Sequence, residues 1–102
     1  MPQFKIHLHA GEGESIDFLA QEEGSEEKYP LGNLRIVQGG LTYVHRSDKY
    51  ETDYVPEFCP ELRETTTAGQ EYFLRLGDKL VFRRKGETTG PVITIEHVGS
   101  TE

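Results

Sequence analysis

Two histidines near the beginning of the chain have the spacing of a pair of metal ligands. His7 and His9 flank Leu8, so on a β-strand both imidazoles face the same side of the sheet and could bind one metal ion. Asp17 is the expected neighbour across a hairpin and could add a carboxylate. The simpler interpretation, which we favour, is two hydrated histidines beside a carboxylate, and metal binding is kept as the weaker alternative.

The same stretch resembles the first metal motif of the cupins, which reads His-x-His-x4-Glu and is matched by His7, His9 and Glu14. The resemblance implies a metal ion bound inside a β-barrel. The chain departs from the family at Gln21, where a glycine is expected, and the second cupin motif is matched by no more than His97.

A second candidate site is a basic segment in the last third of the chain. Five of the 11 basic residues fall within eleven positions: Arg75, Lys79, Arg83, Arg84 and Lys85. Guanidinium and ammonium groups on one strand, next to Thr88 and Thr89, could hold a phosphate group or a nucleotide. We therefore keep Lys79, Arg83, Arg84 and Lys85 as an alternative site for a small anionic ligand. The ordinary interpretation is an edge strand that is protected from aggregation by its charge.

The third candidate is a surface for a protein partner, formed by acidic stretches that carry aromatic residues. The formal net charge is −7, which attracts basic partners and repels nucleic acid and anionic lipid. Aromatic side chains anchor interfaces, while acids around them steer a basic partner. The candidate residues are Tyr50, Asp53, Tyr54, Glu57 and Phe58 in the segment 47–69, and Glu22, Glu23, Glu26 and Glu27 near the N-terminal third. In the alternative, the aromatic residues fold back as a lid over the core.

Patterns for catalysis are weak in this sequence, and we expect no enzyme activity and no cofactor. The acids around Cys59 disfavour an activated thiolate, and no serine stands in a Gly-x-Ser-x-Gly motif. Neither a phosphate-binding loop nor a dinucleotide fingerprint occurs. A single cysteine excludes an internal disulfide, and with no signal-like or membrane-spanning run of apolar residues we expect a cytoplasmic protein.

Short alternating runs of apolar residues are the elements that must position these groups. They predict one hairpin from Phe4 to Ala20 around Gly11–Gly13, a second over residues 34–46 around Gly39-Gly40, and a third over residues 79–98. The expected registers pair Leu8 with Ile16 and His7 with Asp17 in the first hairpin, Ile36 with Tyr43 in the second, and Phe82 with Ile93 in the third. In the second, His45 then lies at the edge of the core.

The whole chain of 102 residues is expected to form one all-β domain, 1–102, of about six to seven antiparallel strands. Residues 76–82 and 90–95 resemble the turn-strand-loop-strand pattern of small SH3-like barrels, so we expect such a barrel or a sandwich. Residues 22–33 and 47–69 are interpreted as loops, with a possible short helix after Pro60. Because a domain this small buries a limited core, self-association into a homo-oligomer is also considered.

The charge pattern predicts a non-enzymatic protein-binding module. Its expected partner is a basic, nucleic-acid-handling protein, on which it would act as an inhibitor or adaptor of the kind that mobile elements encode. The alternative is a small barrel that binds an anionic ligand or a metal ion, and a third possibility is a structural subunit of a larger particle.

Overall fold

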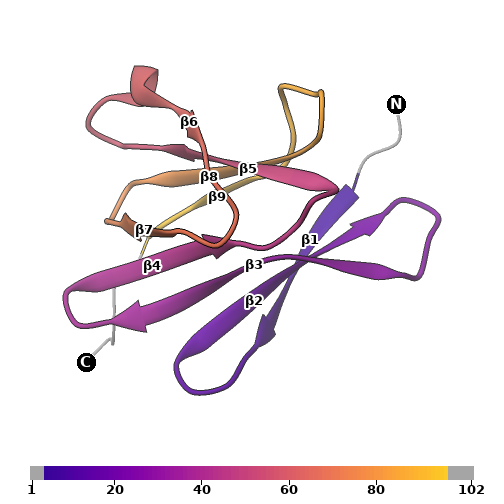
Figure 1. The fold of residues 1–102 in the computed structure, drawn as a ribbon, viewed down its shortest axis with the longest axis horizontal. Coiled ribbons are helices and arrows are strands. Elements are labelled where there is room, and N and C mark those ends of the chain that lie inside the picture. The colour runs from indigo at the N-terminus through magenta and orange to yellow at the C-terminus, as the bar shows by residue number, and fades with distance from the viewer. Residues whose placement is uncertain (1–3, 97–102) are drawn as a thin grey trace.

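The computed structural model describes residues 4–96, which form two antiparallel β-sheets packed face to face (Figure 1). The first sheet has the strand order β1-β2-β3-β4-β7, with β1 (Phe4–Ala10), β2 (Ser15–Glu22), β3 (Lys28–Val37), β4 (Gly40–His45) and β7 (Glu71–Leu74). The second has the order β6-β5-β8-β9, with β5 (Tyr50–Val55), β6 (Glu64–Thr65), β8 (Lys79–Arg84) and β9 (Val92–Thr94). The sequence-based prediction of an all-β fold is confirmed.

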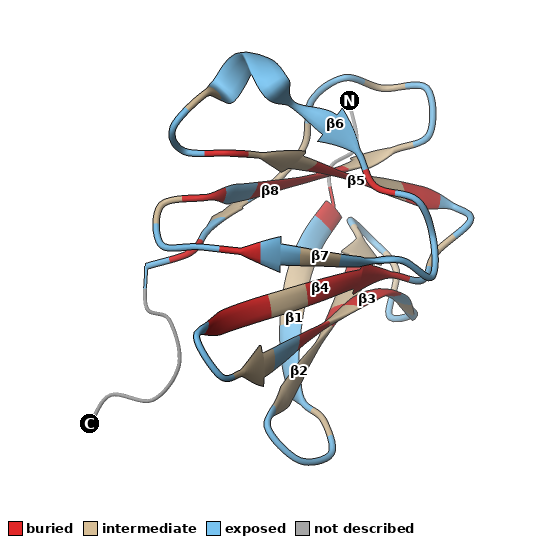
Figure 2. Cartoon of the chain, turned by 60° about the vertical axis from the view of Figure 1, so that its left-hand side comes forward, coloured by how far each residue is buried: buried red, intermediate tan, exposed pale blue. Residues whose placement is uncertain are grey.

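The core lies between the two sheets and is built around three aromatic rings. Phe18 and Tyr43 from the first sheet pack 6.0 Å apart between ring centroids, and Phe82 from the second meets Phe18 edge-on at 5.4 Å. All three are fully buried, and buried residues are concentrated in the central strands β4 and β8 (Figure 2). Edge-to-face aromatic pairs add about 0.5–1.5 kcal/mol beyond the area they bury, so these rings hold the sheets together.

Of the two expected architectures, an SH3-like barrel or a sandwich, the described residues form the second. The described part of the chain makes nine strands in two sheets with no closed barrel, a sandwich-like arrangement. The additional strands come from segments that were interpreted as loops, because β3 begins at Lys28 and both β5 and β6 lie within residues 47–69. In β3, Pro30 lies at an irregularity in the pairing with β2, where a missing N–H is tolerated. β5 carries the acids Glu51 and Asp53 and the polar Thr52, so its hydropathy did not resemble that of a buried strand, although Thr52 and Asp53 are buried.

All three hairpins exist, but each pairs two residues away from its expected register. Leu8 lies opposite Phe18, Ile36 opposite Leu41, and Leu80 opposite Ile93. An offset of two residues leaves every side chain on the same face of its sheet. The predicted inward faces are therefore right, while the predicted cross-strand partners are wrong.

The second hairpin shows why its register moved. Its turn consists of Gln38 and Gly39, and Gly39 has a φ of +87°, a conformation that favours glycine. Gly40 is already part of β4. A glycine is needed at this position, because a Cβ there would lie 2.7 Å from the ring of Phe73 on β7. The Gly-Gly pair therefore serves two different purposes, one in the turn and one in packing.

The segment after β5 is fixed at one end of the sandwich. A short 3-10 helix, η1 (Pro60–Leu62), begins at the proline as expected. The buried carboxylate of Asp78 accepts hydrogen bonds from the backbone N–H of Glu57 at 2.9 Å, from that of Arg75 at 2.8 Å and from the hydroxyl of Tyr54 at 3.2 Å. These bonds hold residues 56–62 against the turn that joins β7 to β8.

Candidate protein-binding surface

Three large apolar side chains are exposed at the end of the sandwich where η1 lies. Phe58 is 79% exposed, Leu62 is 55% exposed and Leu76 is 59% exposed. A hydrogen bond from the Leu62 N–H to the Cys59 oxygen tightens the segment, and Gly77 lies directly against the Glu57 side chain. We call Phe58, Leu62 and Leu76 the Phe58 surface. Leu76 precedes the Gly77 that Glu57 touches, so the three side chains lie at one end of the molecule and form a candidate interaction site.

The residues predicted to bind a partner divide between the interior and the surface. Tyr50 and Asp53 are buried, with 2% and 3% of their surface exposed, and Tyr54 is half-buried above Asp78. Glu57 and Phe58 are exposed. The two tyrosines follow the alternative interpretation, in which aromatic residues cover the core, while Phe58 does not.

Asp53 is the centre of an ion-pair network that joins β5 to β8 and to the segment after η1. Arg83 donates two hydrogen bonds to its carboxylate, at 2.9 and 2.8 Å, and Arg63 donates a third at 2.7 Å. The hydroxyl of Thr65 adds a fourth at 2.9 Å, and Arg83 also pairs with Glu51. Burial raises the pKa of the Asp53 carboxyl, but the bonds from Arg83 and Arg63 outweigh it and hold the pKa below its usual value. The network fastens the segment after η1 to β5 and β8.

The basic segment is largely neutralised by the chain's own carboxylates. Arg84 pairs with Glu22 at 2.5 Å and with Glu87 at 3.3 Å, and Arg83 is held by Asp53. Glu22 also accepts a hydrogen bond from the Tyr50 hydroxyl. Lys79 and Lys85 are exposed but flank opposite ends of β8. The four predicted cations therefore do not converge on one site, and Glu22 belongs to the link between the sheets.

The histidine pair has an arrangement different from the expected one. His9, rather than His7, lies opposite Asp17, and the Asp17 carboxylate accepts a hydrogen bond from the Asn33 amide at 2.7 Å. His7 Nε2 lies 2.6 Å from the Gln21 side-chain oxygen. Within residues 4–96 no three His, Cys, Asp or Glu side chains gather as metal ligands.

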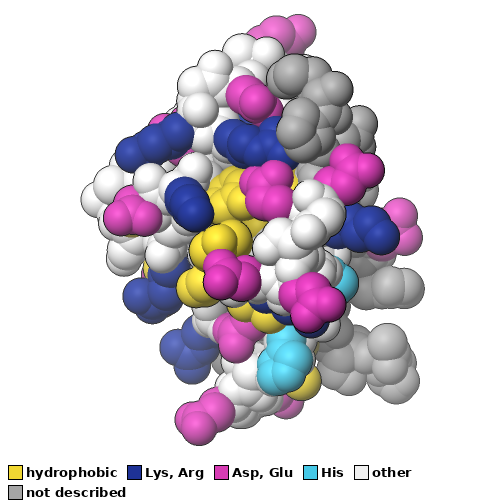
Figure 3. Space-filling model, turned by 90° about the vertical axis from the view of Figure 1, so that its right-hand side faces the viewer, with side chains coloured by type: hydrophobic (Ala, Val, Ile, Leu, Met, Phe, Trp, Pro, Cys, Tyr) yellow, Lys and Arg dark blue, Asp and Glu magenta, His cyan; other side chains and the backbone are white. Residues whose placement is uncertain are grey.

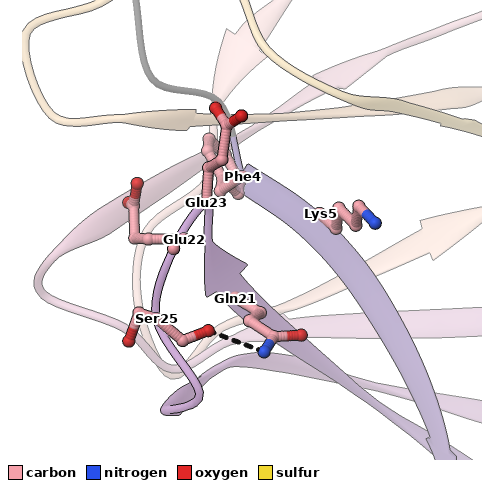
Figure 4. Close-up of a pocket in the computed structure, with 7 residues that line it drawn as sticks. Phe4, Lys5, Gln21, Glu22, Glu23 and Ser25 are labelled. Carbon is pink, nitrogen blue, oxygen red and sulfur yellow. Dashed lines mark hydrogen bonds between the residues drawn. The ribbon is translucent and has the colours of Figure 1, made fainter.

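Two hollows lie in the surface of the first sheet. One of about 600 Å³ lies beside the start of β1, the end of β2 and the turn that follows, and its lining includes Lys5, Glu22 and Glu23 (Figure 4). The other, of about 350 Å³, is lined by residues that include Asp17, Asn33 and Arg46.

A buried polar cluster lies inside the sandwich. The Thr52 hydroxyl is 2.9 Å from the Tyr43 hydroxyl and 3.1 Å from Nδ1 of His45, which is only 4% exposed. His45 is thus inside the core rather than at its edge. Burial lowers the pKa of His45, because the charged imidazolium is poorly solvated there.

This histidine predicts a pH dependence of stability. Below about pH 6.5 the unfolded chain takes up a proton that the folded imidazole resists, so the free energy of unfolding falls as the pH is lowered. The slope is at most about 1.4 kcal/mol per pH unit for one group. Urea titrations at several pH values between about 7.5 and 5 should show this loss. His45→Gln should remove it, and an unchanged slope in that variant would assign the loss to other groups.

Sequence reasoning missed two of the three residues of the Phe58 surface. Leu62 stands among acids after Pro60, and Leu76 precedes the turn at Gly77, so both resembled ordinary ends of elements. The signal that could have found them is a large apolar residue placed where no strand continues to bury it.

No helix formed by the described residues is long and apolar enough to cross a membrane. Comparison of the chain with protein-family models, curated proteins and solved structures finds no match, so a functional assignment has to rest on the geometry above.

Proposed function

We propose that the protein is a non-enzymatic binding module that docks on a basic protein surface through the Phe58 surface. The observation that carries the proposal is Phe58, which is 79% exposed although the segment around it is fixed by Asp78. The neighbouring backbone N–H of Glu57 is held by Asp78, and an exposed aromatic ring next to such a fixed point is the kind of side chain that anchors an interface.

The acids around this surface supply the preference for a basic partner. Glu57, Glu61 and Glu64 are exposed, and none of them forms an ion pair with another residue of the 4–96 range. Their charge is therefore available to steer a basic surface toward the apolar side chains. Extended basic surfaces are typical of nucleic-acid-handling proteins, which supports a role as an inhibitor or adaptor of such a protein in the cytoplasm.

The acidic loop between β2 and β3 does not lie beside the acids around the Phe58 surface. The loop that joins β2 to β3, with Glu23, Glu26 and Glu27, is at the right of Figure 1, whereas η1 is at the upper left. Glu27 also accepts a hydrogen bond from the Tyr29 hydroxyl. The proposal is therefore confined to the Phe58 surface, and the acids of the other loop contribute to its long-range field.

Two substitutions distinguish an interface aromatic residue from a core one. Phe58→Ala should change the free energy of unfolding by no more than about 0.5 kcal/mol, because the ring is exposed. Tyr54→Ala should lower it by about 3 kcal/mol, because this ring packs against the core and binds Asp78. Chemical denaturation of both variants measures the difference. Equal losses would mean that Phe58 is packed in solution, against the proposal.

Docking itself is tested with the immobilised full chain and a soluble cell extract. Basic proteins should be retained at about 50 mM salt and released at about 300 mM, because surface charge is screened over shorter distances as salt increases. Phe58→Ala combined with Leu62→Ala should abolish retention, whereas Lys79→Ala, a matched exposed control on β8, should not. Retention that ignores both salt and the double substitution would refute the proposal.

A further inference from the structure

The two sheets have four edge strands, and one of them differs from the rest. β6, β9 and β7 contain two, three and four residues, and short edges are a common protection against pairing with other chains. β1 contains seven residues, has no proline, and pairs with β2 along its whole length without a bulge. Among the described strands, it is the edge that is long and regular enough to accept a further strand.

The backbone of β1 has a definite set of groups directed away from β2. The N–H of Gly11 donates to the oxygen of Ser15 at 3.0 Å, which fixes the phase of the ladder. In an antiparallel pair, alternate residues bond to the neighbouring strand and those between them point outward. The outward N–H and C=O groups therefore belong to Phe4, Ile6, Leu8 and Ala10. These groups are ready to pair with another extended segment.

The side chains along this edge divide into two rows of different chemistry. Lys5, His7 and His9 share one face of the sheet, and β1 itself contains no carboxylate. On the other face burial decreases along the strand: Phe4 is buried, Ile6 is half-buried, and Leu8, at 56% exposed, presents a large apolar side chain to solvent. Figure 3 looks onto a side of the molecule where histidine and hydrophobic side chains appear together among charged groups.

From these features we infer that β1 is a docking edge for an extended segment of another protein that alternates acidic and apolar residues. Main-chain hydrogen bonds would supply the affinity, as in other cases of strand addition. Carboxylates of the segment would face Lys5, His7 and His9, and its apolar side chains would cover Ile6 and Leu8. This edge is separate from the Phe58 surface and has the opposite charge preference, so one molecule could join two partners.

A second copy of the chain fits this edge less well. Antiparallel pairing of β1 with itself, with like faces aligned and the two-fold axis at the middle residue, places Lys5 opposite His9 and His7 opposite its own copy. Centring the axis on Ile6 pairs Lys5 with His7, and centring it on Leu8 pairs His7 with His9. No such register brings a carboxylate to Lys5, whereas an acidic segment places one opposite it.

The test uses the full chain and an acetylated peptide of about seven residues with the sequence Thr-Glu-Val-Glu-Val-Glu-Thr. Saturating peptide should slow amide hydrogen exchange at Ile6 and Leu8, whose N–H groups point outward, and leave His7 and His9 unchanged because these already bond to β2. A peptide with lysine in place of glutamate should bind at least about tenfold more weakly. No protection at Ile6 and Leu8, or equal binding of the two peptides, would overturn the inference.

Substitutions in β1 and at control positions show whether peptide binding depends on this edge and whether something other than the peptide occupies it. Leu8→Pro should abolish binding by removing an outward donor, and Lys5→Glu should reverse the preference between the peptides, while Lys79→Glu on the other sheet should not. Phe58→Ala should leave peptide binding intact, which separates this edge from the proposed function. Slow exchange of the Ile6 and Leu8 amides without peptide would also overturn the inference. If this protection grows with protein concentration, the occupant of the edge is a second copy of the chain. If it vanishes on deletion of residues 97–102, the occupant is the chain's own terminus.

Discussion

Replacing Arg83 by methionine is expected to lower the free energy of unfolding by about 3–5 kcal/mol, the usual cost of removing one partner from a buried ion pair. Arg83 gives the Asp53 carboxylate two hydrogen bonds, and the side chains of the pair are only 11% and 5% exposed. Methionine retains most of the packing but leaves the carboxylate to Arg63 and Thr65. Glu51 and the backbone oxygen of Glu87 lose a donor as well. Urea denaturation at neutral pH measures the loss.

Two further variants show whether the loss comes from the ion pair. Lys79→Met makes the same chemical change at an exposed position of the same strand and should cost no more than about 0.5 kcal/mol. In the background of Asp53→Asn, the change Arg83→Met should cost far less than it does alone, because the buried charge that needs the guanidinium is gone. Equal losses in Arg83→Met and Lys79→Met would show that the network does not stabilise the fold.

The second large effect is expected from Phe82→Ala, which should lower the free energy of unfolding by about 3–5 kcal/mol. The Phe82 ring has no exposed surface and lies edge-on to Phe18 at 5.4 Å and to Tyr43 at 6.2 Å between ring centroids. Its removal leaves a cavity between the two sheets. The sheets cannot easily move together to close it, because their strands are held by hydrogen bonds to their neighbours. Phe58→Ala removes the same atoms from the surface and is the matched control. A loss below about 1 kcal/mol for Phe82→Ala would mean that the core repacks.

The faces of the strands could be predicted from the sequence, but their registers could not. Alternation places Leu8, Phe18 and Leu80 on the inner faces whichever of two registers is chosen, since an offset of two preserves every face. The choice between registers depends on close packing that hydropathy does not record. In the last hairpin, for example, Gly90 packs so tightly on the backbone of Phe82 that any side chain there would collide with it.

The candidate site shows the same limit. Tyr50, Tyr54 and Phe58 are four residues apart and stand among similar acids, so the sequence treats them alike. What separates them is β5, which turns the first two toward the core and ends before the third. That strand escaped detection because Asp53, an acid in its middle, is neutralised by an arginine thirty residues later. A pairing over such a distance has no local signature.

The path of the chain between the sheets has a consequence for how the protein is made. After β4 the chain crosses to the second sheet for β5 and β6, returns to the first for β7, and crosses again for β8 and β9. The first sheet is therefore complete only when β7 has been made, and the second only when β9 has been made. Folding is expected to be governed by such non-local contacts. A cut between β7 and β8 would keep every strand of the first sheet but remove Phe82, which packs on Phe18 in the core, so neither piece is expected to fold alone.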